Sequence, residues 1–141
     1  MKTLLVLSFF PAFVPPTSGG ESRLFNVYRE LSRRFRVILI SSSHLDVALE
    51  TIEHSDSFRE IRVPKGHAFA TAWAELAKGA GAGDLSAPSL ALSSSNFDSL
   101  HKAYLDQYPV VDVIIHESPF LIDYDLFLGW DNKPRIYNAY N

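Results

Sequence analysis

Solid runs of apolar residues alternate along this chain with stretches in which apolar residues recur at helical spacing. Residues 4–7 form the first run, and its lack of polar alternation is typical of a strand buried on both faces of a parallel sheet. Over residues 24–35 the apolar positions return every three or four residues, which predicts a helix. Residues 37–40 form a second solid run, and the serines at 41–43 are expected to end it. The chain therefore opens as strand, helix, strand.

The middle of the chain has weaker patterns. Ile61 and Val63 alternate with arginines, which predicts an edge or half-exposed strand that stops at Pro64. Helical spacing then returns over residues 69–76, and Gly79 is expected to cap that helix at its C-terminal end. This region therefore continues the alternation of strand and helix.

The last third of the chain repeats the opening pattern. Helical spacing over residues 97–108 is followed by a third solid apolar run at residues 110–115. A short helix is expected at residues 121–128 and a final strand at residues 135–137. Strands that alternate with helices predict an α/β fold, a Rossmann-like open and mostly parallel sheet with helices on both faces.

Composition and charge narrow the class of protein. The 141 residues are 47% hydrophobic, which fits one domain spanning residues 1–141. A net charge of -3 gives no electrostatic reason to expect nucleic acid as a partner. The chain has no cysteine, which excludes disulfides and thiolate metal sites and fits a cytoplasmic protein.

The N-terminal segment has a second interpretation. Lys2 followed by apolar residues 4–10 has the composition of a signal peptide. Prolines at 11, 15 and 16 occupy the region where a cleavage site would lie, so we favour a buried first strand. The run is also shorter than the ~20 apolar residues that a membrane-spanning helix needs.

Ligands of open parallel sheets bind beyond the carboxyl ends of the strands. The polar segments that follow the predicted strands are therefore the candidate ligand-binding residues. Gly19 and Gly20 immediately precede the predicted first helix, and Arg23 lies in its first turn. Their backbone N–H groups could contact a phosphate or a sugar hydroxyl. An ordinary loop and helix start is an equally good interpretation, because the pair is neither a dinucleotide-binding fingerprint nor a P-loop. Serines 41–43 and His44 follow the second predicted strand and are expected at the same edge.

The third inner strand leads to His116, which is the strongest candidate for a residue with a chemical role. His116 follows a buried apolar run, so its imidazole is expected to face the cleft, with Glu117 orienting it or binding sugar hydroxyls. Position alone leaves a structural and a functional role for His116 equally open. Asn138 follows the last strand and is expected at the same edge. No two histidines have metal-ligand spacing, so no metal site is expected.

These segments resemble the N-terminal domain of glycosyltransferase family 4 (group 1) and its GT-B-type relatives. An apolar strand ending in Phe-Phe-Pro, a proline-rich loop, Gly19-Gly20 and Arg23 look like that family's opening. Residues 113–119 are similar to its later strand and histidine turn. Residues 136–141 resemble a strand that often ends in a His-Asn pair, although Tyr140 stands where that histidine would be. The resemblance covers nearly the whole chain.

The resemblance implies transfer of a sugar from a nucleotide-sugar donor to a carbohydrate or lipid acceptor, without a cofactor or essential metal. His116 would contact the transferred sugar, and Gly19, Gly20, Arg23, Glu117 and Asn138 would bind substrate. A C-terminal donor-binding domain, in the same chain or a separate one, would complete the enzyme. Because 141 residues leave no room for it, the chain alone is expected to be inactive.

Three other interpretations stay open. One is a non-catalytic α/β module that binds a small ligand or a protein partner. Another is a nucleotide-sugar epimerase or dinucleotide enzyme, which the missing glycine fingerprint disfavours. Peripheral membrane contact through Trp73 and nearby apolar residues of the middle helices is a separate hypothesis.

Overall fold

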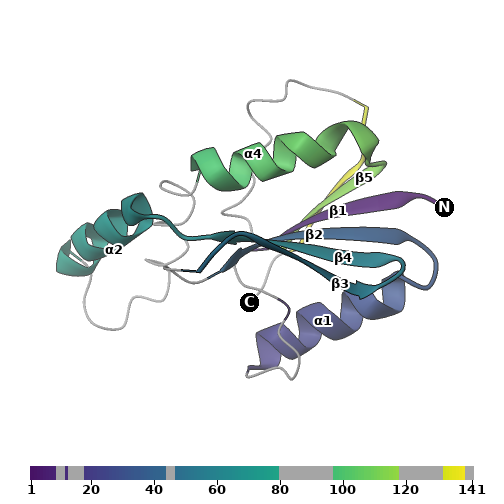
Figure 1. Cartoon of the computed structure of the whole chain (residues 1–141), viewed down its shortest axis with the longest axis horizontal. Coiled ribbons are helices and arrows are strands. Elements are labelled where there is room, and N and C mark those ends of the chain that lie inside the picture. The colour runs from purple at the N-terminus through teal and green to yellow at the C-terminus, as the bar shows by residue number, and fades with distance from the viewer. Residues whose placement is uncertain (9–11, 13–17, 44–46, 80–96, 118–131, 139–141) are drawn as a thin grey trace.

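The computed structural model of the protein describes residues 1–8, 12, 18–43, 47–79, 97–117 and 132–138 (Figure 1). Within these ranges six strands form one sheet in the order β3-β4-β2-β1-β5-β6. The strands are β1 (Thr3–Ser8), β2 (Arg36–Ser43), β3 (Glu50–Ser55), β4 (Phe58–Pro64), β5 (Val113–His116) and β6 (Arg135–Tyr137). All neighbouring strands are parallel except β3 and β4, which are antiparallel. The fold is therefore the predicted α/β class, a Rossmann-like and mostly parallel sheet.

Helices cover both faces of this sheet. Helix α1 (Gly19–Leu31) packs Leu24 and Tyr28 against one face, whereas α4 (Phe97–Gln107) packs Leu100 and Tyr104 against the other. Figure 1 shows α4 and α1 on opposite sides of the strands. The alternating residues of the central strands divide accordingly into two apolar clusters, because successive strand side chains point to opposite faces.

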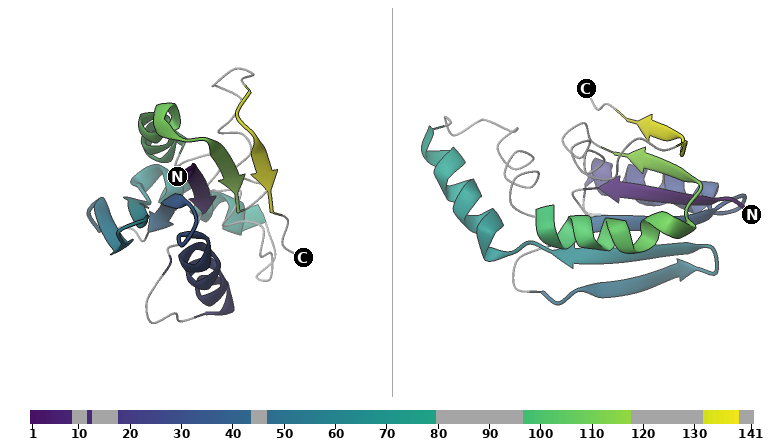
Figure 2. Two further views of the ribbon diagram at one scale, coloured as in Figure 1. Left: turned by 90° about the vertical axis from the view of Figure 1, so that its right-hand side faces the viewer. Right: turned by 90° about the horizontal axis from the view of Figure 1, so that it is seen from above.

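Helix α2 (His67–Gly79) has a different position. It follows β4 and extends beyond the carboxyl ends of the strands, as Figure 1 and the right-hand view of Figure 2 show. Phe69 of α2 is buried and packs in the same apolar cluster as Leu100 and Tyr104 of α4, whereas Trp73 is exposed. The predicted helix is confirmed, although Gly79 is its last residue and not a cap beyond it.

Most strands predicted from the apolar runs are confirmed as buried strands, but the end of β2 was predicted wrongly. Serines 41–43 continue the strand as its last three residues and are buried. The hydroxyl of Ser41 is accommodated because it donates a hydrogen bond of 2.7 Å to a carboxylate oxygen of Glu60 on β4. A serine run thus forms part of the sheet interior here.

Strand β4 ends at Pro64 as expected, and its mixed burial fits the half-exposed strand that the alternation predicted. The edge position, the other predicted alternative, is wrong, because β4 lies between β2 and β3. The edge on this side of the sheet is β3, which the sequence pattern did not reveal because most of its residues are exposed and it has no apolar run. The antiparallel pairing of β3 with β4 makes this edge of the sheet a hairpin.

Two boundaries in the remaining elements also differ from the prediction. Helix α1 ends at Leu31, before Phe35. Strand β5 begins at Val113, because Tyr108–Val110 forms a short 3-10 helix, η1. The final strand β6 is confirmed, whereas His44, residues 121–128 and Tyr140 lie outside the described residues.

Candidate functional site

The carboxyl edge of the sheet brings three of the predicted site residues together. Arg23, in α1, donates a hydrogen bond of 2.9 Å from Nη1 to Oε2 of Glu117, which follows β5. Asn138, which follows β6, donates from Nδ2 to Oε1 of the same carboxylate at 2.9 Å. The beginning of α1 and the ends of β5 and β6 therefore share one edge, as parallel pairing of β1, β5 and β6 requires.

Glu117 is the centre of this cluster, which we call the Glu117 cluster: Arg23, Tyr28, Glu117 and Asn138. Only 1% of Glu117 is exposed, and its Oε1 also accepts a hydrogen bond from the hydroxyl of Tyr28. Burial of a carboxylate is costly unless charged and polar donors compensate it, and here an arginine, a phenol and an amide do so. Glu117 therefore holds Arg23 and Asn138 in place.

Arg23 is the most exposed member of the cluster. Its side chain is 41% exposed, whereas Glu117 is buried beneath it. The cluster thus presents a fixed cation at the carboxyl edge of the sheet.

His116 is the last residue of β5 and is fully buried. Its ring stacks on that of Tyr137 in β6, with centroids 5.2 Å apart and planes 9° apart. The two residues are register partners in the sheet, so the pairing of β5 with β6 sets the stack. Tyr137 is 48% exposed, and the sequence reasoning did not single it out. The accessible part of this stack is therefore a tyrosine ring.

Gly19 and Gly20 do not precede the first helix, as the sequence predicted, but are its first two residues. Ser18 caps the helix: its Oγ accepts from the Glu21 backbone N–H at 3.2 Å, and its own N–H donates to Glu21 Oε2 at 3.1 Å. The residue combination Ser18 and Glu21 is a capping box, a signal the sequence contained. A Cβ added at Gly19 would meet no atom within 4 Å, so open space adjoins the first turn.

A second buried carboxylate, Glu60 in β4, was missed by the sequence reasoning. It accepts hydrogen bonds from Ser41 Oγ at 2.7 Å, from the Ala12 N–H at 3.0 Å and from Arg62 Nη2 at 3.2 Å, and His54 Nε2 lies 2.7 Å from Oε2. Burial raises the pKa of Glu60, but these hydrogen bonds outweigh it and leave the pKa below its ordinary value. The partners come from three strands and the segment after β1, so no local motif could reveal them.

Lys65 lies just after β4, beside the end of β2. Its Nζ donates to the carbonyl oxygens of Ser42 and Ser43, at 3.2 Å and 3.0 Å, and lies 5.5 Å from the centre of the Phe69 ring. Burial lowers the pKa of Lys65 to about 8, because the charged ammonium loses solvation there. An amine at the carboxyl edge that is partly neutral near physiological pH is chemically distinct from a fully solvated lysine.

Two further features bear on the class of protein. In the described ranges, no three His, Asp or Glu side chains are grouped so that they could hold a metal ion. None of the helices described is both long and apolar enough to cross a membrane.

Together, the fold and the carboxyl-edge residues define an α/β protein with a Rossmann-like sheet and a polar cluster at the carboxyl edge of that sheet. A comparison with known proteins does not narrow this class. No protein-family model matches the chain, and no curated protein matches it with significant similarity.

Proposed function

We propose that the chain is the N-terminal, acceptor-binding half of a GT-B-type glycosyltransferase, which moves a sugar from a nucleotide-sugar donor to a carbohydrate or lipid acceptor. The observation that carries the proposal is the Glu117 cluster, which joins the first helix to the ends of β5 and β6 at the carboxyl edge. That edge is where open parallel sheets bind their ligands.

The cluster has the chemistry that sugar binding needs. Arg23 offers donors to hydroxyl or phosphate oxygens, and the Asn138 amide can both donate and accept. The half-exposed ring of Tyr137 offers an apolar face beside them, the kind of surface that stacks on a sugar ring. We assign acceptor binding to Arg23, Tyr137 and Asn138, and a positioning role to Glu117.

The resemblance to the family's histidine turn implies that His116 contacts the transferred sugar, but His116 is fully buried, so we assign that contact to the exposed ring of Tyr137 and a positioning role to His116. The stack of the two rings would fix the orientation of the tyrosine ring. The open first turn of α1, with Gly19 and Gly20, would lie near the donor phosphates, where helix N–H groups favour an anion. No cofactor enters this proposal.

The donor half is the second part of the proposal. A C-terminal domain, in the same chain or separate, would hold the nucleotide and supply the charges that stabilise the leaving diphosphate. Without it the donor is neither oriented nor clamped, so the 141-residue chain should show no transfer. Robust turnover of UDP-, GDP- or ADP-sugars by the purified chain would refute this part.

Backbone amide shifts recorded during sugar titration test the acceptor-binding half. With a panel of mono- and disaccharides, we expect at least one sugar to shift the amides of residues 23, 117 and 138 together. Arg23→Gln and Asn138→Ala should each weaken that binding about tenfold, the loss of one or two good hydrogen bonds. Arg33→Gln, at an exposed Arg33–Glu30 pair away from the cluster, is the matched control and should bind normally. Sugars that shift no residue of the cluster would contradict the proposal.

One observation favours a second candidate, a non-catalytic module that binds a small ligand or partner. His116 is buried, and the Glu117 carboxylate is buried and accepts hydrogen bonds from Arg23, Tyr28 and Asn138, so neither is poised as an exposed acid or base. In that case, ligand binding would depend on Arg23 and Asn138, but joining the domain to its proposed donor half would yield no consumption of nucleotide sugar.

A further inference from the structure

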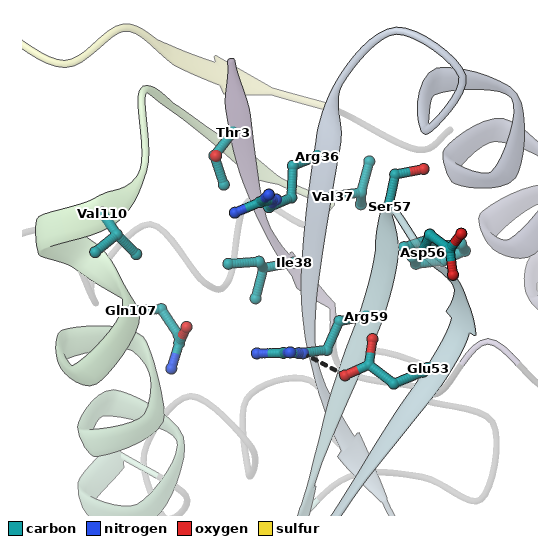
Figure 3. A pocket seen from close by; sticks show the side chains of 11 residues that line it. Thr3, Arg36, Val37, Ile38, Glu53, Asp56, Ser57, Arg59, Gln107 and Val110 are labelled. Carbon is teal, nitrogen blue, oxygen red and sulfur yellow. Dashed lines mark hydrogen bonds and ion pairs between the residues drawn. The ribbon is translucent and has the colours of Figure 1, made fainter. Parts of the chain in front are cut away.

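A hollow of about 400 Å³ lies at the amino edge of the sheet (Figure 3). Residues that begin β1, β2 and β4 line it, so it lies at the end of the strands opposite the Glu117 cluster. It lies between the beginnings of the central strands and the C-terminal end of α4. Its volume is in the range of small-molecule sites. The residues that line it are Thr3, Arg36, Val37, Ile38, Glu53, Asp56, Ser57, Phe58, Arg59, Gln107 and Val110. No element of the proposed transferase site uses this hollow.

Two arginines give the hollow its chemical character. Arg36 begins β2 and Arg59 lies in β4, where it is the register partner of Ile38. Arg36 and Ile38 are two residues apart in one strand, so their side chains point to the same face. In Figure 3 both guanidinium groups point into the hollow on the same side of the sheet, toward Gln107 of α4.

The ion pairs leave donors available on both arginines. Arg59 donates from Nε to Oε1 of Glu53 at 2.6 Å, a contact that orients the guanidinium and leaves its two terminal nitrogens without an ion-pair partner in the described residues. Across the same described part of the chain, Arg36 has no side-chain ion pair. Asp56 also lines the hollow, but on the side away from Gln107 (Figure 3).

We propose that this hollow binds a small oxyanion ligand, a molecule whose phosphate or carboxylate groups lie between Arg36 and Arg59. Guanidinium forks match such groups because two parallel N–H donors meet two oxygens. Gln107 adds an amide on the facing wall, and Ile38 and Val110 form an apolar surface between the polar groups. The inference is independent of the proposed function, since it concerns the other edge of the sheet.

Calorimetric titration tests the site, with inorganic pyrophosphate and citrate as separate probes at low ionic strength. Preference for one probe assigns the ligand's acidic groups as phosphates or carboxylates. We expect saturable binding of at least one probe, weakened about tenfold by Arg36→Gln and by Arg59→Gln, because each removes charge-assisted hydrogen bonds. Arg33→Gln removes the same charge from the exposed Arg33–Glu30 pair outside the hollow and should leave affinity unchanged.

Glu53→Gln changes the affinity in the opposite direction. It removes a negative charge beside Arg59 that repels an anionic ligand, so binding should tighten severalfold, and it decides the question if an arginine variant fails to fold. Thermal unfolding identifies such a failure. Absence of binding by both probes, or equal weakening by Arg33→Gln and the hollow variants, would overturn the proposal.

Discussion

The hydroxyl of Tyr28, in the middle of α1, donates a hydrogen bond to the carboxylate of Glu117 at the end of β5, and both side chains are buried. This contact joins residues 89 positions apart in the sequence. It fixes the helix over the sheet at the same carboxylate that holds Arg23 and Asn138. The position of the proposed acceptor site and the packing of α1 therefore depend on one buried carboxylate.

Replacing Tyr28 with phenylalanine should destabilise the protein by about 1–3 kcal/mol, because the Glu117 carboxylate would lose a buried donor while keeping its burial. Arg23→Gln should cost less, because the Arg23 side chain is 41% exposed and water can replace its bond. Urea unfolding of the two variants measures the difference. An equal or reversed order would show that the phenol contributes little to the cluster.

Glu60 should make stability depend on pH in the acidic range. Its pKa in the folded protein lies below the ordinary value of 4.5, so the folded state binds this proton less readily than the unfolded state. The resulting stabilisation is complete above about pH 4.5 and is lost as the pH falls through the folded pKa.

Glu60→Gln isolates that contribution. The variant should be less stable at neutral pH by about 3–5 kcal/mol, because Arg62 would lose its buried partner. The difference from the wild-type protein should shrink as the pH is lowered from 6 toward 3, in unfolding curves recorded across that range. A difference that stays constant with pH would mean that the charge of Glu60 is not what stabilises the fold.

Lys65 should react with amine-directed reagents at a lower pH than an ordinary lysine. Its pKa of about 8 against the usual 10.5 means that roughly half of it is neutral near pH 8. Peptide mapping after brief acetylation at a series of pH values measures the midpoint for this residue. Labelling of the peptide that contains position 65 should disappear in Lys65→Arg, and a midpoint near pH 10.5 for that peptide in the wild-type protein would contradict the prediction.

The capping box at the start of α1 should contribute measurably to stability. Ser18→Ala removes the acceptor for the Glu21 N–H and should lower the free energy of unfolding by about 1 kcal/mol. Ser18→Asp keeps an acceptor at the same position and serves as the matched variant, with near wild-type stability. Equal losses in both variants would show that the cap hydrogen bond is not the source.

Some elements could be predicted from local sequence because the spacing of their apolar residues indicates a strand or a helix. Strands β1, β2 and β5 are inner strands whose apolar runs reflect burial on both faces, and α1, α2 and α4 carry helical spacing. Strand β3 has no such signal, because an edge strand with exposed residues does not need an apolar run. Its pairing with β4 is visible only in the sheet.

The site residues likewise divide into those that the sequence predicted and those that only the folded structure revealed. The rule that parallel strands deliver their ends to one edge led to Arg23, His116, Glu117 and Asn138 from sequence alone. Which of them contact each other, and that Tyr28 and Tyr137 complete the group, depends on the packing of α1 and on the pairing of β5 with β6. No local pattern encodes such side-chain partners.

The sequence by itself determined the alternation of elements and the parallel α/β class, because apolar periodicity is a local consequence of which faces are buried. Only the tertiary structure decided that serines 41–43 remain in β2, that Glu60 and Glu117 are buried carboxylates, and that Arg36 and Arg59 share a hollow. A buried polar group is stable only with partners, and here those partners come from distant parts of the chain. Their proximity therefore exists only once the sheet has formed.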